Sequence, residues 1–216
     1  MSKDIILLIG GTGLVGQALL KELVFKNNIS EIRVPIRDLK TVVFNHSKII
    51  YKVVSFMDLD QNPDLFNGVT HVISAIGTTL KKAKTREQFQ IVDHYLPKVV
   101  ARLAKENGVE SYSLVSSLGA NKDSRNFYLQ VKGQLESDLE LLGLKKLLIY
   151  RPSLLDGKRR EFRLGEFFGL MFFKLFSFMI PKKYRPTSVM LLAQKIVFQM
   201  NEKTDGVHFF EADMIH

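Results

Sequence analysis

The segment DIILLIGGTGLVG (4–16) constrains the fold of this chain more than any other stretch. An apolar run leads into the loop GGTGLVG (10–16), and an amphipathic segment follows it (14–27). Gly10, Gly13 and Gly16 have the spacing G-x-x-G-x-x-G, typical of the turn between strand and helix in a dinucleotide-binding unit. A ligand-free glycine turn is the alternative, but the strand before the loop and the helix after it favour dinucleotide binding.

Each glycine of this loop has a separate predicted task. Gly10 permits the tight turn, Gly13 lets the backbone approach a pyrophosphate, and Gly16 lets the helix pack closely on the strand. Backbone N–H groups at the start of the helix would face the phosphates. The residues that we predict to bind the cofactor here are Gly10, Thr12, Gly13, Leu14, Val15 and Gly16.

Strand-like and helix-like segments alternate along the rest of the chain. Strands are predicted at 4–10, 31–37, 48–56, 69–77, 111–117, 145–152 and 206–212, and helices at 14–27, 85–107, 125–143 and 188–201. Repeated β-α units imply a mostly parallel, doubly wound α/β sheet (Rossmann-like) with helices on both faces. The length of 216 residues favours a single domain, 1–216. The segment 153–186 breaks the alternation, and we predict that it is an insertion covering the substrate site.

Residues that follow the predicted strands indicate which dinucleotide binds. Arg37 follows the second strand and could meet the 2′-phosphate of NADP, whereas the adjacent Asp38 could bind the ribose of NAD instead. We favour NADP and keep NAD as the alternative. Asp58 could accept a hydrogen bond from the adenine amino group. The small residues of Ala75-Ile76-Gly77 would let the chain pass close to the nucleotide.

A second group of residues suggests catalysis. Ser116 and Ser117 lie at the carboxyl end of the fifth strand, where ligands of such sheets bind. Tyr128 and Lys132 are four positions apart in FYLQVKG, so they share one face of the next helix. Lysine stabilises a phenolate, so tyrosine can exchange a proton while a nicotinamide exchanges hydride. We predict Ser116, Tyr128 and Lys132 as catalytic residues, with Ser117 as the rival serine.

These segments resemble the short-chain dehydrogenases/reductases. The nucleotide loop, the serine strand and the Tyr-x-x-x-Lys pair of that family match GGTGLVG, LVSSLGA and YLQVK, respectively. SAIGTTLKKAKTREQFQIVDHYLP, SSLGANKDSRNFYLQVKGQLE and RPSLLDGKRREFRLGE look like one atypical branch, the Tat-interacting-protein-type oxidoreductases, over most of residues 4–170. The resemblance implies NADP(H) contacts by Tyr128 and Lys132, a turn at Arg151-Pro152 that flanks the cofactor, and a regulatory protein partner.

Composition and charge narrow the kinds of site, location and partner that the chain can have. The chain has no cysteine, its five histidines show no ligand spacing, and we predict no metal site. Ile5 to Ile9 is too short for a signal peptide, so a cytoplasmic location is expected. The net charge of +9 includes three basic clusters, KKAKTR (81–86), KRREFR (158–163) and KKYR (182–185). No nucleic-acid-binding signature accompanies them, and we predict no nucleic-acid partner.

The apolar segment GEFFGLMFFKLFSFMI (165–180) lies between two of these basic clusters. It is shorter than a membrane-spanning helix. It could cover the substrate cleft, or it could receive an apolar or amphiphilic, anionic substrate. It could also contact an acidic membrane surface peripherally.

The leading hypothesis is therefore an NADP(H)-dependent oxidoreductase that acts on a carbonyl/alcohol pair by a Ser-Tyr-Lys mechanism. A second hypothesis is an NADP(H)-sensing regulatory or membrane-peripheral protein without turnover. A third is an isomerase or dehydratase that retains its cofactor.

Overall fold

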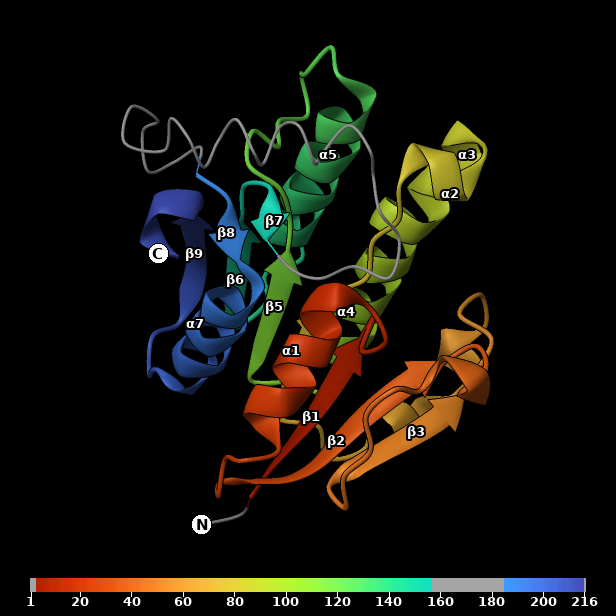
Figure 1. The fold of residues 1–216 in the computed structure, drawn as a ribbon, viewed down its shortest axis with the longest axis vertical. Helices are drawn as coiled ribbons and strands as arrows, with labels where there is room; N and C mark the ends of the chain where they lie inside the picture. The colour runs from red at the N-terminus through yellow and green to blue at the C-terminus, as the bar shows by residue number, and fades with distance from the viewer. Residues whose placement is uncertain (1–2, 157–184, 216) are drawn as a thin grey trace.

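A parallel sheet of seven strands forms the centre of the computed structural model, which describes residues 3–156 and 185–215 (Figure 1). The strand order is β3-β2-β1-β4-β5-β6-β9, and every neighbouring pair is parallel. The strands are β1 (Asp4–Ile9), β2 (Ile29–Ile36), β3 (Ile49–Val53), β4 (His71–Ser74), β5 (Ser111–Val115), β6 (Lys146–Arg151) and β9 (Gly206–Glu211). The predicted doubly wound α/β fold is confirmed.

Helices cover both faces of this sheet. Figure 1 shows α1 and α7 in front of it and α4 and α5 behind it. The helices are α1 (Leu14–Leu23), α2 (Leu80–Ala83), α3 (Arg86–Gln90), α4 (Leu96–Glu106), α5 (Phe127–Leu141) and α7 (Val189–Asn201). Short 3-10 turns occur at Leu39–Thr41, Leu59–Gln61, Pro63–Leu65 and Ala212–Met214.

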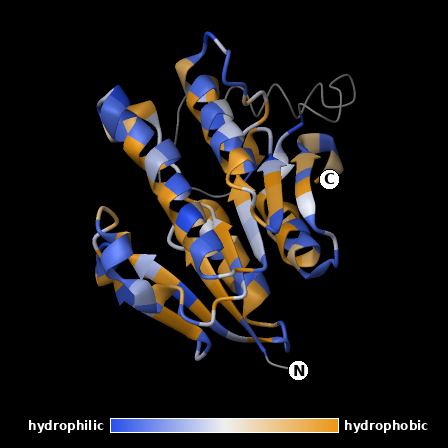
Figure 2. Ribbon diagram, turned by 180° about the vertical axis from the view of Figure 1, so that it is seen from behind, coloured by the Kyte–Doolittle hydropathy of each residue, from blue (hydrophilic) through white to orange (hydrophobic). Residues whose placement is uncertain are grey.

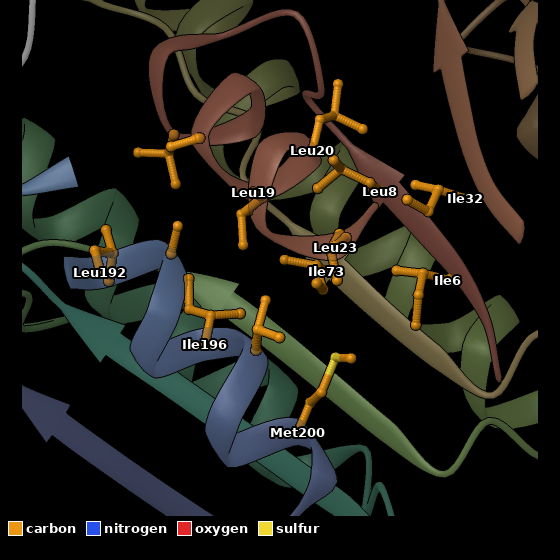
Figure 3. Close-up of a cluster of buried hydrophobic side chains, with 14 of the residues drawn as sticks. Ile6, Leu8, Leu19, Leu20, Leu23, Ile32, Ile73, Leu192, Ile196 and Met200 are labelled. Atoms are coloured by element: carbon orange, nitrogen blue, oxygen red, sulfur yellow. The ribbon is translucent and has the colours of Figure 1, made fainter. Parts of the chain in front are cut away.

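Strand β1 explains why two hydrophobic cores form. Parallel strands covered on both faces are apolar at every position, and successive side chains point to opposite faces. Ile6 and Leu8 accordingly pack in the core under α1 and α7 (Figure 3), whereas Leu7 and Ile9 pack in the core under α4 and α5. Figure 2 shows apolar residues on these strands and more hydrophilic stretches on the outer surfaces of the helices.

The strand order indicates where a ligand is expected to bind. The chain winds outward from β1 through β2 to β3, then returns to pair β4 with the other side of β1. Ligands of open α/β sheets bind outside the carboxyl ends of the strands where the winding direction reverses. That position lies between the loops that follow β1 and β4.

The helix predicted at 85–107 differs from the expectation in one detail. It contains a π-helical turn, Ile91–Tyr95, between α3 and α4. Pro97 lies in the first turn of α4. Proline lacks the N–H that would bond the carbonyl four residues earlier, and its ring crowds that carbonyl, so the helix widens before it.

The two flanks of the predicted insertion lie side by side. Strands β7 (Leu155–Asp156) and β8 (Thr187–Ser188) pair in parallel, and the Ser153 N–H donates to the Thr187 hydroxyl. Residues 157–184 lie outside the described part of the chain, and with them the apolar segment 165–180 and the basic clusters 158–163 and 182–185, except for Arg185.

Candidate functional site

The glycine loop packs tightly against its surroundings. Gly10 has φ +84°, and a Cβ built on it would lie 2.7 Å from backbone atoms of Ala75 and Ile76. A Cβ on Gly16 would lie 2.2 Å from the Gly10 carbonyl oxygen. A side chain at either position would therefore displace backbone, so both positions require glycine. The loop after β1 consequently lies directly against Ala75-Ile76, the segment after β4.

Gly13 differs because it is exposed, although the Gly10 carbonyl oxygen limits the room beside it. It is the exposed N-cap of α1, and of the described atoms only the Gly10 oxygen lies within 4 Å of an added Cβ, at 3.3 Å. No side chain caps this helix, and its first turn carries no acidic residue. Thr12 and Leu14 flank Gly13 half-buried, while Val15 points inward. An uncapped helix start beside exposed backbone fits the phosphates of a dinucleotide.

The residues expected near the adenosine end of the cofactor differ in their exposure and in whether their side chains already have a bonding partner. Arg37 is exposed directly after β2, and no carboxylate among residues 3–156 and 185–215 forms an ion pair with it. Asp38 instead accepts the Lys40 N–H at 2.9 Å and caps the turn Leu39–Thr41. Asp58 is half-buried after β3, and Gly77 is exposed after β4. The geometry thus leaves Arg37 more available than Asp38.

Tyr128 and Lys132 lie on α5, whose start is fixed by Asn126, since the Asn126 side chain accepts the Leu129 N–H. The Tyr128 ring is half-buried and packs on Phe89, with ring centroids 5.8 Å apart. Lys132 is only 4% exposed. Burial by itself would lower the pKa of Lys132, but the charges of Asp93 and Tyr128 raise this pKa above its usual value. The structure therefore holds a charged lysine one helical turn from a partly accessible phenol.

Asp93 is the partner of that lysine. Its Oδ1 lies 2.8 Å from the Lys132 Nζ, and its Oδ2 accepts the Thr78 N–H at 2.7 Å. A Cβ on Gly77 would lie 3.3 Å from the Asp93 Oδ1 and 3.9 Å from the Lys132 Nζ. The ion pair therefore lies against the loop after β4, next to the segment predicted to flank the nucleotide.

The two candidate serines have different surroundings. The Ser116 side chain is buried and donates to the Glu136 Oε1 at 2.5 Å. The Ser117 hydroxyl is half-buried and makes only a long contact, 3.4 Å, with the neighbouring Leu118 carbonyl. The hydrogen of Ser116 is thus committed to a carboxylate, and Ser117 has the less engaged hydroxyl.

Arg151 belongs to the same buried network as Ser116. Its guanidinium donates to both oxygens of Glu136, at 3.1 and 2.6 Å, and to Glu211 at 2.9 Å. The hydrogen bond to Glu136 is the main cause of the raised pKa of Arg151. Arg151 therefore ties α5 to β6 and β9, while the Pro152 carbonyl accepts the Leu118 N–H and joins the loops after β5 and β6.

Sequence reasoning gave little weight to two of these carboxylates. From its place in IVDHY (91–95), Asp93 is equally consistent with a residue that orders the helix beside the cofactor and with a solvated surface residue, and no prediction concerns Glu136. A local signal existed for Glu136, because Tyr128, Lys132 and Glu136 recur every four residues and share the inner face of α5. No local signal could reveal Asp93, which lies 39 positions from Lys132 in the chain.

The basic cluster 81–86 is the one fully described by the structure. Its charged side chains are exposed on α2 and at the start of α3, beyond the carboxyl ends of the strands (Figure 1). Among the described helices, none has the length and apolar character needed to cross a membrane.

Comparisons with known proteins identify the family. Residues 10–167 match the family model described as NAD(P)H-binding. Rattus norvegicus Protein HTATIP2 is 34% identical over 174 residues, which cover 80% of this chain and 72% of HTATIP2. Debaryomyces hansenii Protein FMP52, mitochondrial, is 37% identical over 158 residues, which cover 71% of this chain and 68% of FMP52. The mitochondrial name of that relative differs from the cytoplasmic location expected for this chain.

Solved structures agree on the fold. Bordetella bronchiseptica WbmH, in complex with NAD+, has a TM-score of 0.74 at 15% identity, covering 97% of this chain and 76% of that one. The chain belongs to the NAD(P)H-binding family and is a relative of HTATIP2, in agreement with the resemblance seen in the sequence.

Proposed function

We propose that this protein is an NADP(H)-dependent oxidoreductase that interconverts a small-molecule carbonyl and its alcohol. One observation carries the proposal: a half-buried Tyr128 lies on the same face of α5 as Lys132, which is buried and charged. Burying a charged lysine costs free energy unless the charge is paired, and charged groups of this kind cluster at functional sites. The uncapped start of α1 supports cofactor binding on the adjacent side of the crevice.

The proposed chemistry assigns separate tasks to the side chains. When bound, the nicotinamide supplies a hydride for reduction or accepts one for oxidation. In the reducing direction Tyr128 donates its phenolic proton to the substrate oxygen. The Lys132 ammonium stabilises the phenolate that remains, because opposite charges attract strongly in a buried site.

The serine of this set is proposed to be Ser117. The Ser116 hydrogen is committed to Glu136, so Ser116 has none to donate to a substrate oxygen. Ser117 follows it at the same end of β5 and has the less engaged hydroxyl. We therefore expect Ser117→Ala to reduce kcat, whereas Ser116→Ala acts mainly on stability through the network of Glu136 and Arg151.

NADP is the proposed cofactor because Arg37 is exposed after β2 without a carboxylate partner in the described chain. Arginine binds phosphate through charge-assisted hydrogen bonds. NAD remains the alternative through Asp38. The substrate is proposed to be a small molecule, and a trial panel includes apolar and anionic carbonyl compounds. It also includes nucleotide sugars, since structures of this fold contain UDP or UDP-glucuronic acid beside NAD.

A single substitution tests the proposal. Tyr128→Phe keeps the aromatic contact with Phe89 but removes the phenolic proton. We expect NADPH binding, measured by fluorescence titration, to persist, while carbonyl reduction falls by roughly 100-fold or more.

Tyr95→Phe is the matched control, because Tyr95 is exposed on the π-helical turn. Equal turnover by the wild type and Tyr128→Phe would exclude the tyrosine mechanism. Tight NADPH binding by a wild type that reduces no member of the panel would favour the sensing alternative.

A further inference from the structure

The π-helical turn Ile91–Tyr95 places one carboxylate in the interior. Pro97 cannot donate a backbone hydrogen bond to residue 93, and the widened turn lies immediately before α4. Asp93 within this turn is 0% exposed. Single π-turns inside longer helices often occur at functional positions. Pro97 thus gives a local reason for the distortion, and the distortion accompanies the burial of Asp93.

Each oxygen of Asp93 has a different partner. Oδ1 lies 2.8 Å from the Lys132 Nζ on α5, and Oδ2 accepts the Thr78 N–H in the loop after β4. One carboxylate therefore joins three elements: the π-turn, the helix that carries Tyr128, and the loop beside the nucleotide crevice. A solvated surface carboxylate would not connect them.

We infer that Asp93 is a positioning residue of the proposed site, which holds the buried Lys132 ammonium charged and fixed beside Tyr128. The inference rests on the proposed function. Without a carboxylate partner, a buried lysine loses its proton more readily, because burial disfavours the charged form. A neutral Lys132 could not stabilise a phenolate, so Asp93 acts on the reaction through Lys132 and not by contact with substrate.

The other charged groups around Lys132 do not replace Asp93. Glu136 and Tyr128, both on α5, also favour the ammonium form of Lys132, but their effects are smaller than that of Asp93. Glu136 is itself bonded to Arg151 and to Ser116. Among the described residues, Asp93 is the carboxylate that forms an ion pair with Lys132.

The test measures the protonation of Lys132 in the cofactor-free, full-length protein. Lysine labelled with ¹³C at Cε gives one NMR signal per side chain, and the signal missing from Lys132→Met identifies residue 132. In the wild type we expect this signal to titrate above the exposed lysines, whose pKa is about 10.4. In Asp93→Asn, which can still accept the Thr78 N–H, we expect the pKa of Lys132 to fall by about one unit or more.

Two further variants test whether the negative charge of Asp93 sets the pKa of Lys132. Asp93→Glu restores the negative charge and is expected to recover at least half of the lost shift. Asp138→Asn is the control, since Asp138 pairs with His94 and Lys98 between α4 and α5. It is expected to leave the titration of Lys132 unchanged. An unchanged titration of Lys132 in Asp93→Asn would overturn the inference. A wild-type Lys132 that titrates below the exposed lysines would also overturn it, and that measurement does not require any variant to fold.

Turnover supplies the second measurement. If the wild type reduces a carbonyl, we expect the alkaline limb of its kcat/KM profile to move to lower pH in Asp93→Asn, with kcat lowered more than the KM for NADPH is raised. An unmoved profile would refute the positioning role. Absence of any reductase activity would refute the proposed function instead, and the NMR titration would still decide whether Asp93 keeps Lys132 charged.

Discussion

Two adjacent lysines at the start of β6 are predicted to differ sharply in their effect on stability. Lys145 is exposed, whereas Lys146 is 4% exposed. The Lys146 ammonium donates to the backbone carbonyls of Gln199, at 2.7 Å, of Met200, at 3.3 Å, and of Glu202. These carbonyls lie at the end of α7, where helix geometry leaves oxygens without partners and the helix dipole favours positive charge. Lys146 is thus a C-terminal cap supplied from another element.

The size of the effect follows from these contacts. Hydrogen bonds to a charged group contribute about 1.5–3 kcal/mol each, so three give a gross contribution of roughly 4–9 kcal/mol. Burial offsets part of this, as the lowered pKa of Lys146 indicates. We therefore expect Lys146→Met, which keeps the aliphatic stem, to lower the free energy of unfolding by about 2–4 kcal/mol.

Urea denaturation followed by circular dichroism measures this effect, with Lys145→Met as the matched control. The control is expected to change the free energy of unfolding by less than about 0.5 kcal/mol. Hydrogen exchange should also accelerate in the last turn of α7 in Lys146→Met. Equal stabilities for the two variants would show that the cap does not contribute as argued.

Three further predictions concern the loop, acid stability and the cofactor. Gly16→Ala, whose Cβ would lie 2.2 Å from backbone, should destabilise the fold by about 1–3 kcal/mol, whereas Gly13→Ala, whose Cβ would lie 3.3 Å from the Gly10 oxygen at the N-cap of α1, should weaken NADPH binding and lower the free energy of unfolding by less than Gly16→Ala does. Burial lowers the pKa of His71 despite the nearby Asp4. As the pH falls, His71 therefore binds a proton in the unfolded chain before it does so in the folded protein. The free energy of unfolding should therefore be steady above about pH 6.5 and should decline below that pH, towards the lower pKa of His71 in the folded state. The decline should be smaller in His71→Gln. Identical urea curves at about pH 7.5 and 5.5 would contradict this prediction. Arg37→Ala should raise the Kd for NADPH by roughly 10- to 150-fold and leave that for NADH unchanged, and an equal change for both cofactors would exclude a 2′-phosphate contact.

Local patterns in the sequence determined the secondary structure and its layering. The apolar run of β1 specifies a strand covered on both faces, and the three glycines specify the turn into α1, because these signals depend on residues close in the chain. The spacing of Tyr128 and Lys132 placed both on one face of α5 for the same reason. Pro97 carried a local signal for the π-turn, although the burial of Asp93 did not follow from it.

Contacts between distant segments were decided only by the tertiary structure. Asp93 meets Lys132, Ser116 meets Glu136, and Lys146 reaches the end of α7 because strand order and helix packing bring these elements together. No periodic pattern distinguishes Lys145 from Lys146 or Ser116 from Ser117 along the chain. What surrounds each of these side chains depends on elements 20 to 56 residues away in sequence, which only the tertiary structure brings close.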